Sequence, residues 1–227
     1  MRNKVSIIIL FSFSIIFATS DDIYRYKIKF LGIPVATCKV IYSDTIFYNI
    51  KSKKLDYRVN TNSLINKIFN INNHYTIIID QNTYSTLYYK KETSQPNITN
   101  SIKTSLINEI VKYEKSDIVI AQNDKNIFTI LYLIHTGQYD IIEKIDILER
   151  EGKYYNLNFQ QKTINKFELL LEERDSKDFG LIKNTDIFLW GLFLEDAKNT
   201  IISNEENGYI DKCIFKRGFA KITAKLF

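Results

Sequence analysis

Glycine and proline are scarce in this sequence, which has seven glycines and two prolines in 227 residues. The glycines stand singly, so there is no glycine-rich loop of the kind that wraps a phosphate. The sequence also lacks a glycine-serine-glycine elbow and a cysteine beside a histidine, which are common elements of nucleophilic catalysis. We therefore predict neither a catalytic motif nor a cofactor. The aromatic content of 14% is typical of a folded chain.

Histidine and cysteine are equally rare, with two residues of each. His74, His135, Cys38 and Cys213 have no metal-ligand spacing, so no metal site is expected. Two distant histidines offer little to a catalytic triad, and we interpret both as structural. Both cysteines lie in strand-like runs. In an exported protein Cys38 and Cys213 can form one disulfide, or each can remain a small buried hydrophobe, and the sequence leaves both alternatives open.

Residues 1–20 have the order of a secretory signal peptide: basic Arg2 and Lys4, an apolar run over 5–17, and small residues at 18–20. We predict cleavage near Ser20 and export to the periplasm or cell envelope. The apolar run is shorter than the roughly 20 residues of a membrane-spanning helix. A retained N-terminal anchor is the alternative, and no transmembrane segment is expected after cleavage.

Charge of one sign is not in large excess. The formal net charge is +5, and loss of two basic residues with the leader gives 5 − 2 = +3. Basic residues are dispersed among nearly as many acids, so nucleic acid is not an expected partner. The region 21–227 is long enough for a single domain with one core.

A strict alternation begins directly after the leader. Apolar and aromatic residues at 24, 26, 28 and 30 alternate with Arg25, Lys27 and Lys29, which is typical of a half-buried antiparallel strand. The "LGIP" sequence at 31–34 then marks a turn, and a second strand follows. The opening stretch therefore predicts a β-hairpin.

Similar runs recur along the chain, with turn signals about every 8 to 12 residues, which favours an antiparallel sheet, sandwich or barrel. We expect strands over 45–52, 54–60, 73–80, 83–92, 107–115, 116–122, 139–149, 153–161, 165–174, 186–196 and 208–227. The polar segment 94–101 is expected to be a mobile loop or strand crossover, and 203–208 a hairpin loop. Residues 63–70 fit either a helix or a strand.

One helix is predicted near 124–136, with Asp124 as N-cap and Gly137 as the stop. The expected fold is mainly β: a single domain with a strongly curved or barrel-like antiparallel sheet and one or two short helices.

Neighbouring acids occur at 172–173, 195–196 and 205–206. Adjacent strand residues face opposite ways, so these pairs cannot act together as a glycosidase dyad. A sheet that curls around a helix can instead enclose an apolar cavity, the alternative being a fully packed core. The residues expected to line such a cavity are Tyr26, Phe30, Phe128, Leu131 and Trp190.

Four stretches carry a resemblance to a known family: "YRYKIKFLGIPVA", "NIFTILYLIHTG", "DIFLWGLFLED" and "GFAKITAKL". Together they resemble the bacterial exported family called domain of unknown function 3108. The sequence departs from the family at Ala36, where a second glycine is usual, and at 197–198, where arginine and proline are usual. The resemblance implies an exported envelope protein with a curved or barrel-like sheet, and it brings no established catalytic residues.

The leading functional hypothesis is a non-enzymatic periplasmic or envelope protein that binds a lipid or another apolar ligand on the concave face of its sheet. The alternative is an assembly factor that engages an envelope protein through a sheet edge or through 94–101. A third hypothesis, an enzyme acting on cell-wall glycan, requires carboxylates that converge from distant strands.

Overall fold

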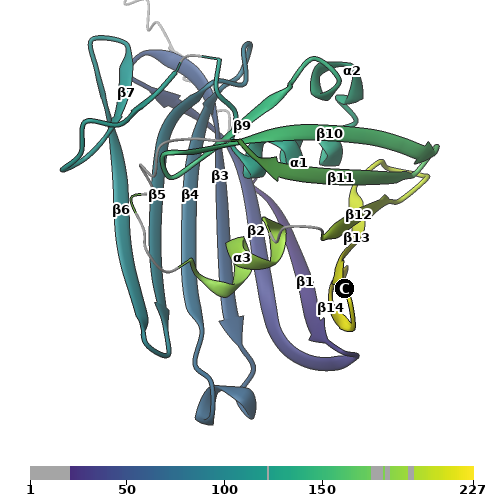
Figure 1. Ribbon diagram of the computed structural model, residues 1–227. Coiled ribbons are helices and arrows are strands. Elements are labelled where there is room, and N and C mark those ends of the chain that lie inside the picture. Colours follow the sequence, from purple (N-terminus) through teal and green to yellow (C-terminus); the bar gives the residue numbers. More distant parts are fainter. Residues whose placement is uncertain (1–20, 122, 175–180, 182–184, 194–196) are drawn as a thin grey trace, which may run out of the picture.

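The structure, a computed structural model, describes residues 21–121, 123–174, 181, 185–193 and 197–227, without the side chain of Trp190. The expected signal peptide lies outside these residues. The described residues form a mainly β fold, as predicted. One antiparallel sheet of 14 strands curls into a nearly closed barrel around short helices (Figure 1). None of the described helices is long and apolar enough to cross a membrane.

The first eight strands follow one another in the sheet as a series of hairpins. They are β1 Asp22–Phe30, β2 Ile33–Phe47, β3 Ile50–Thr61, β4 Asn72–Asp80, β5 Thr86–Gln95, β6 Ile98–Ile107, β7 Ile110–Tyr113 and β8 Val119–Ile120. The later strands are β9 Ile147–Arg150, β10 Lys153–Thr163, β11 Lys166–Glu173, β12 Lys198–Ser203, β13 Ile210–Arg217 and β14 Ala220–Leu226.

Strand β1 connects the first strands of the chain with its last strand, because it pairs with β2 on one side and with β14 on the other. Tyr26 lies opposite Cys38 in one register and opposite Leu226 in the other. The two outer strands of the sheet, β8 and β9, are brought together by Lys125, which forms an isolated parallel bridge with Leu148. The barrel is thereby almost closed.

The predicted hairpins at "LGIP" and at 203–208 are confirmed, since β1 pairs with β2 and β12 with β13. The prediction for 94–101 is wrong: this segment is the end of β5, a tight turn and the start of β6, with Asn97 at a φ of 63°. Asparagine tolerates this left-handed conformation better than most residues. The runs 45–52 and 107–115, predicted as single strands, each contain a hairpin turn at positive φ.

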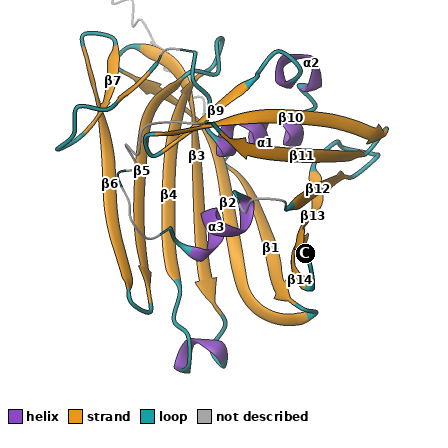
Figure 2. Cartoon of the chain, in the orientation of Figure 1, coloured by secondary structure: helices purple, strands orange, loops and turns teal. Residues whose placement is uncertain are grey.

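Helix α1 Ile127–His135 confirms the predicted central helix, but its N-cap is Asn126 and not Asp124. The Asn126 side chain accepts a hydrogen bond from the Thr129 N–H at 2.9 Å, whereas Asp124 accepts one from Ala121. Every residue of α1 is buried. A helix that is apolar on all sides belongs in the core, and α1 accordingly lies inside the barrel (Figure 2).

Residues 186–196 were expected to form a strand, and that prediction is wrong for the described part. They begin helix α3 Ile187–Leu192, capped by Asp186, which accepts a hydrogen bond from Leu189 N–H at 3.0 Å. A short apolar run fits a buried helix as well as a strand, and the Asp186 cap favours the helix. With α2 Tyr139–Ile142 there are three short α-helices among the described residues rather than one or two, plus the 3₁₀ helix η1 Ile65–Lys67 inside 63–70.

The two interior helices fill the barrel unequally. Phe128 of α1 packs on Tyr57 and Tyr75 of the sheet, and Phe188 of α3 stacks against Phe128 with ring centroids 6.2 Å apart. Helix α3 has only six residues. Below it, none of the described α-helices lies against the concave face of β1 to β3 (Figures 1 and 2).

Candidate ligand-binding site

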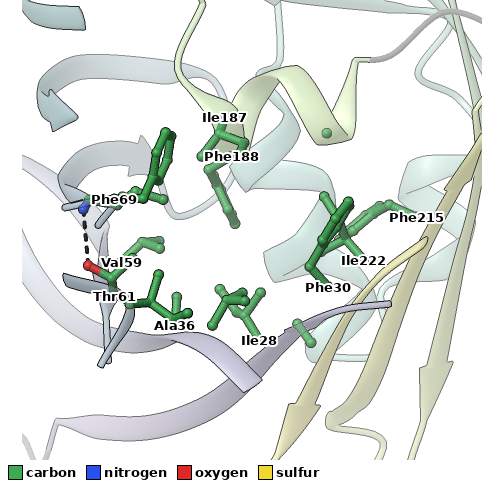
Figure 3. A pocket seen from close by; sticks show the side chains of 15 residues that line it. Ile28, Phe30, Ala36, Val59, Thr61, Phe69, Ile187, Phe188, Phe215 and Ile222 are labelled. Atoms are coloured by element: carbon green, nitrogen blue, oxygen red, sulfur yellow. Dashed lines mark hydrogen bonds between the residues drawn. The ribbon is translucent and has the colours of Figure 1, made fainter. Parts of the chain in front are cut away.

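An apolar cavity of about 270 Å³ lies below α3, against the concave face of the sheet (Figure 3). We call this end of the barrel the lower end. It is formed by the β1–β2 tip at 31–32, the β13–β14 tip at 218–219 and the loop 62–71 that carries η1. The cavity is close to the roughly 300 Å³ of the smallest typical ligand sites.

Fifteen side chains or glycines line the cavity, and their chemistry is nearly uniform: all are aliphatic or aromatic except Gly191 and Thr61. They are Ile28, Phe30, Val35, Ala36, Val59, Thr61, Ile65, Phe69, Ile71, Ile187, Phe188, Gly191, Phe215, Ile222 and Ala224.

Small residues create this space. Ala36 on β2, Ala224 on β14 and Gly191 on α3 stand at inward positions where larger side chains would fill it. A Cβ atom at Gly191 would lie only 3.3 Å from Cδ1 of Ile222, so the glycine allows α3 to approach β14 closely. The cavity therefore follows from residue size at three positions on three different elements.

The one hydroxyl in the lining is already occupied. Thr61 Oγ1 accepts a hydrogen bond from the Ile71 N–H at 3.1 Å (Figure 3) and donates one to Asn66 at 3.2 Å. The cavity thus offers a ligand no free polar side chain. It reaches the surface at the lower end, where the lining residues Phe30 and Phe69 are 41% and 37% exposed. This arrangement can hold an apolar chain whose polar group remains in water.

The five residues predicted to line a cavity are only partly brought together. Phe30 lines the main cavity, and Tyr26 and Leu131 line a separate, smaller pocket of about 50 Å³, whose lining shares Ile28, Phe188, Phe215 and Ala224 with that of the main cavity. Phe128 packs behind Phe188 and does not line the cavity. Trp190 belongs to α3, and its side chain is outside what the structure describes.

A buried charged cluster fastens α3 above the cavity. Lys91 Nζ lies 2.6 Å from Glu151 Oε1 and 3.0 Å from Asp186 Oδ2, and all three residues are at most 4% exposed. Asp186 also accepts a hydrogen bond from Tyr75 at 2.5 Å, and Glu151 accepts one from Tyr89 at 3.0 Å. Strands β4 and β5, the β9–β10 turn and α3 thus meet at one buried lysine.

A third buried carboxyl, that of Glu149, lies nearby. Burial raises the pKa of Glu149 to about 8, although hydrogen bonds from Gly152 N–H and from Tyr113 act in the opposite direction. Around Glu149 and Glu151 the interior leaves only about 10 Å³, which is no more than one water needs. These carboxyls converge, but the described structure leaves no room for a sugar beside them.

The sequence interpretation missed this cluster, although a signal was present. Glu149 ends the strand-like run 139–149, in which its carboxylate stands next to the apolar residues Ile147 and Leu148, and Glu151 follows in the turn before the next run. Lys91 continues the inward face of Tyr89. A single charged residue on the face of a strand that is otherwise apolar indicates a buried charge, and Lys91 fits this pattern.

The two cysteines and His135 lie in the core, whereas His74 is half-buried and contacts Asp56 at 2.7 Å. Cys38 and Cys213 are buried free thiols on β2 and β13, and β1 and β14 lie between these strands. The disulfide that the sequence left open is therefore absent. His135 accepts a hydrogen bond from Ile210 N–H at 3.2 Å, and burial lowers its pKa to about 4. Among the described residues no three His, Cys, Asp or Glu side chains are placed to hold a metal ion.

Comparison with known proteins yields one structural likeness. No protein-family model matches the chain, and no curated protein is significantly similar to it. It is similar in structure to a β-barrel-like protein of the domain of unknown function DUF1849 from Brucella abortus, with a TM-score of 0.45 and 8% identity over 90% of this chain and 95% of the other. The domain of unknown function 3108 was not found in these comparisons.

Proposed function

We propose that this chain is a non-enzymatic exported protein that binds a lipid acyl chain, or a comparably narrow apolar molecule, in the cavity below α3. The observation that carries the proposal is the cavity itself. It is apolar throughout, its one hydroxyl is satisfied within the chain, and it reaches the surface at one end. Each methylene that leaves water for such a site contributes about 0.8 kcal/mol.

The export part of the proposal depends on residues 1–20, whose composition is that of a signal peptide. An exported apolar-chain binder would meet its ligand in the cell envelope, as the leading hypothesis from the sequence holds.

The test is saturable binding of a fluorescent fatty acid, combined with mass spectrometry of lipids that co-purify with the protein. An apolar cavity of about 150 Å³ holds a benzene ring, so the ring of Ala36→Phe would take about half of the space. We expect this variant to bind about tenfold more weakly or worse. Thr37→Phe, the adjacent exposed position on the same strand, is the matched control and should bind as the natural chain does.

Absence of saturable binding by the natural chain, or equal binding by the Ala36→Phe variant, would contradict the proposal. Folding of both variants is checked by circular dichroism, because overpacking of a core costs about 1–3 kcal/mol.

The assembly-factor alternative ranks second. Segment 94–101 is a tight hairpin, and the outer edge of β9 is met by Lys125 through the Leu148 bridge and a 2.8 Å hydrogen bond from Glu149 N–H. Segment 94–101 and the edge of β9 therefore offer a partner strand less exposed backbone than a mobile loop and an open sheet edge would. The glycan-acting enzyme ranks third, because the converging carboxyls are sealed from solvent.

A further inference from the structure

The outer face of four neighbouring strands carries a concentration of positive charge. Strands β1, β12, β13 and β14 contain nine basic and two acidic residues, a net charge of 9 − 2 = +7, whereas the whole chain has +5. These strands are consecutive in the sheet, in the order β1, β14, β13, β12. Nine of the 31 basic residues, which are dispersed in the sequence, thus lie on these four neighbouring strands.

The strand register places these lysines directly opposite one another. Lys27 pairs with Lys225, which pairs with Lys212 on the next strand. Four residues away along β14, Lys221 pairs with Lys216, which pairs with Lys198. Like charges directly opposite on neighbouring strands are destabilising. Within the described part of the chain, no carboxylate forms an ion pair with any of these six lysines.

The lysines also line a hollow of about 470 Å³ on the outer face, which includes Lys27, Lys212, Lys221 and Lys225. Repulsion among these lysines is unfavourable in the isolated protein, and a negatively charged partner would offset it.

Exposed apolar side chains lie at the adjoining lower end. Leu31 and Ile33 at the β1–β2 tip are 51% and 63% exposed, and Phe219 at the β13–β14 tip is 89% exposed. The two tips are neighbours, since the Leu31 N–H donates to the Lys221 carbonyl at 2.9 Å. Leu64 and Ile68 in the η1 loop are also mostly exposed. These residues surround the end at which the cavity reaches the surface.

We infer that the lower end of the barrel docks on an anionic lipid bilayer. The apolar tips enter the interface, and the lysine rows face the headgroups. Apolar side chains beside clustered lysines are the two signals that together give stable attachment to a membrane surface. This docking places the cavity opening at the lipid, and it does not depend on whether the cavity binds a chain.

The test is co-sedimentation with vesicles of phosphatidylcholine alone or mixed with phosphatidylglycerol, using residues 21–227, which contain every described strand and helix. Binding is expected only to the mixed vesicles and should weaken as salt is raised. The triple variant Lys27→Gln, Lys212→Gln, Lys225→Gln should bind about 100-fold more weakly. Phe219→Ser with Ile33→Ser should also reduce binding.

The matched control removes the same charge from exposed lysines elsewhere: Lys51→Gln, Lys115→Gln and Lys144→Gln. It should retain binding within about twofold, because these positions are outside the four strands. Equal losses in the two triple variants, or no binding to anionic vesicles, would overturn the inference. Retention on a soluble anionic polysaccharide without vesicle binding would overturn the assignment to lipid. Loss of fatty-acid binding alone would leave docking intact and would instead count against the proposed function.

Discussion

At the scale of single residues, two buried ionisable groups, Glu149 and His135, change the stability of the folded state with pH in opposite directions. Burial raises the pKa of Glu149 from 4.5 to about 8 and lowers the pKa of His135 from 6.5 to about 4. Between pH 4.5 and 8 the folded state holds the Glu149 proton more tightly than the unfolded state, so its contribution to stability falls as pH rises. Between pH 4 and 6.5 the unfolded state holds the His135 proton more tightly, so that contribution rises with pH.

The first prediction concerns Glu149→Gln, which keeps the shape of the protonated side chain and cannot ionise. The variant should match the natural chain in stability near pH 4 and exceed it above pH 8, by on the order of 4 kcal/mol. Urea unfolding across this range measures the difference, from which the His135 contribution cancels because both proteins retain it. Exposed Glu143→Gln is the control. A parallel pH dependence of the natural chain and the Glu149→Gln variant would contradict the assignment.

At the scale of elements, the contacts of its N-cap residue Asp186, rather than its length, hold helix α3 in place. Six residues are too few for a stable isolated helix. Asp186 caps the helix, accepts the Tyr75 hydroxyl and faces Lys91 across 3.0 Å. Removal of one partner from a buried ion pair leaves an uncompensated charge. Helix α3 therefore covers the cavity only while the ion pair between Asp186 and Lys91 is intact.

The second prediction is that Asp186→Ala lowers the free energy of unfolding by about 3–5 kcal/mol and removes amide exchange protection from α3. Asp140→Ala, in the exposed first turn of α2, is the control and should change stability by less than about 0.5 kcal/mol. Equal effects of the two substitutions would show that Asp186 does not hold the helix.

At the scale of the whole molecule, the barrel is a single sheet because β1 pairs with β14. Strands from the two ends of the chain meet there, and Ile222 and Ala224 of β14 form part of the cavity wall. Without β14, β1 and β13 would each present an unpaired edge, and such edges favour aggregation.

The third prediction is that deletion of 220–227 abolishes cooperative unfolding of the entire barrel, including β2 to β4, which lie far from the deletion in sequence. Thermal melts followed by circular dichroism, with amide exchange of β3, measure this. Deletion of the exposed Phe227 alone is the control and should cost no more than about 1 kcal/mol. Persistent protection of β3 in the longer deletion would indicate two independently stable halves.

Local pattern was enough to predict most of the sheet. Period-two alternation placed β1, β2 and β4, and the apolar run ending at Gly137 placed α1, because burial of one face or of all faces leaves a direct periodic signal. The errors fall where local signals compete. Asp186 makes a helix of an apolar run that equally fits a strand, and asparagine at positive φ turns 94–101 into a hairpin.

The sequence by itself determined the class of fold, the hairpin that opens the chain and the apolar interior, because these depend on the spacing of neighbouring residues. Only the tertiary structure decided where space remains in that interior, since Ala36, Gly191 and Ala224 come from distant segments and act through their combined small size. The same holds for Lys91 with Asp186, and for the lysine rows that link residue 27 with residues 212 and 225. These groupings depend on strand register and closure of the barrel, which bring together residues that no local pattern connects.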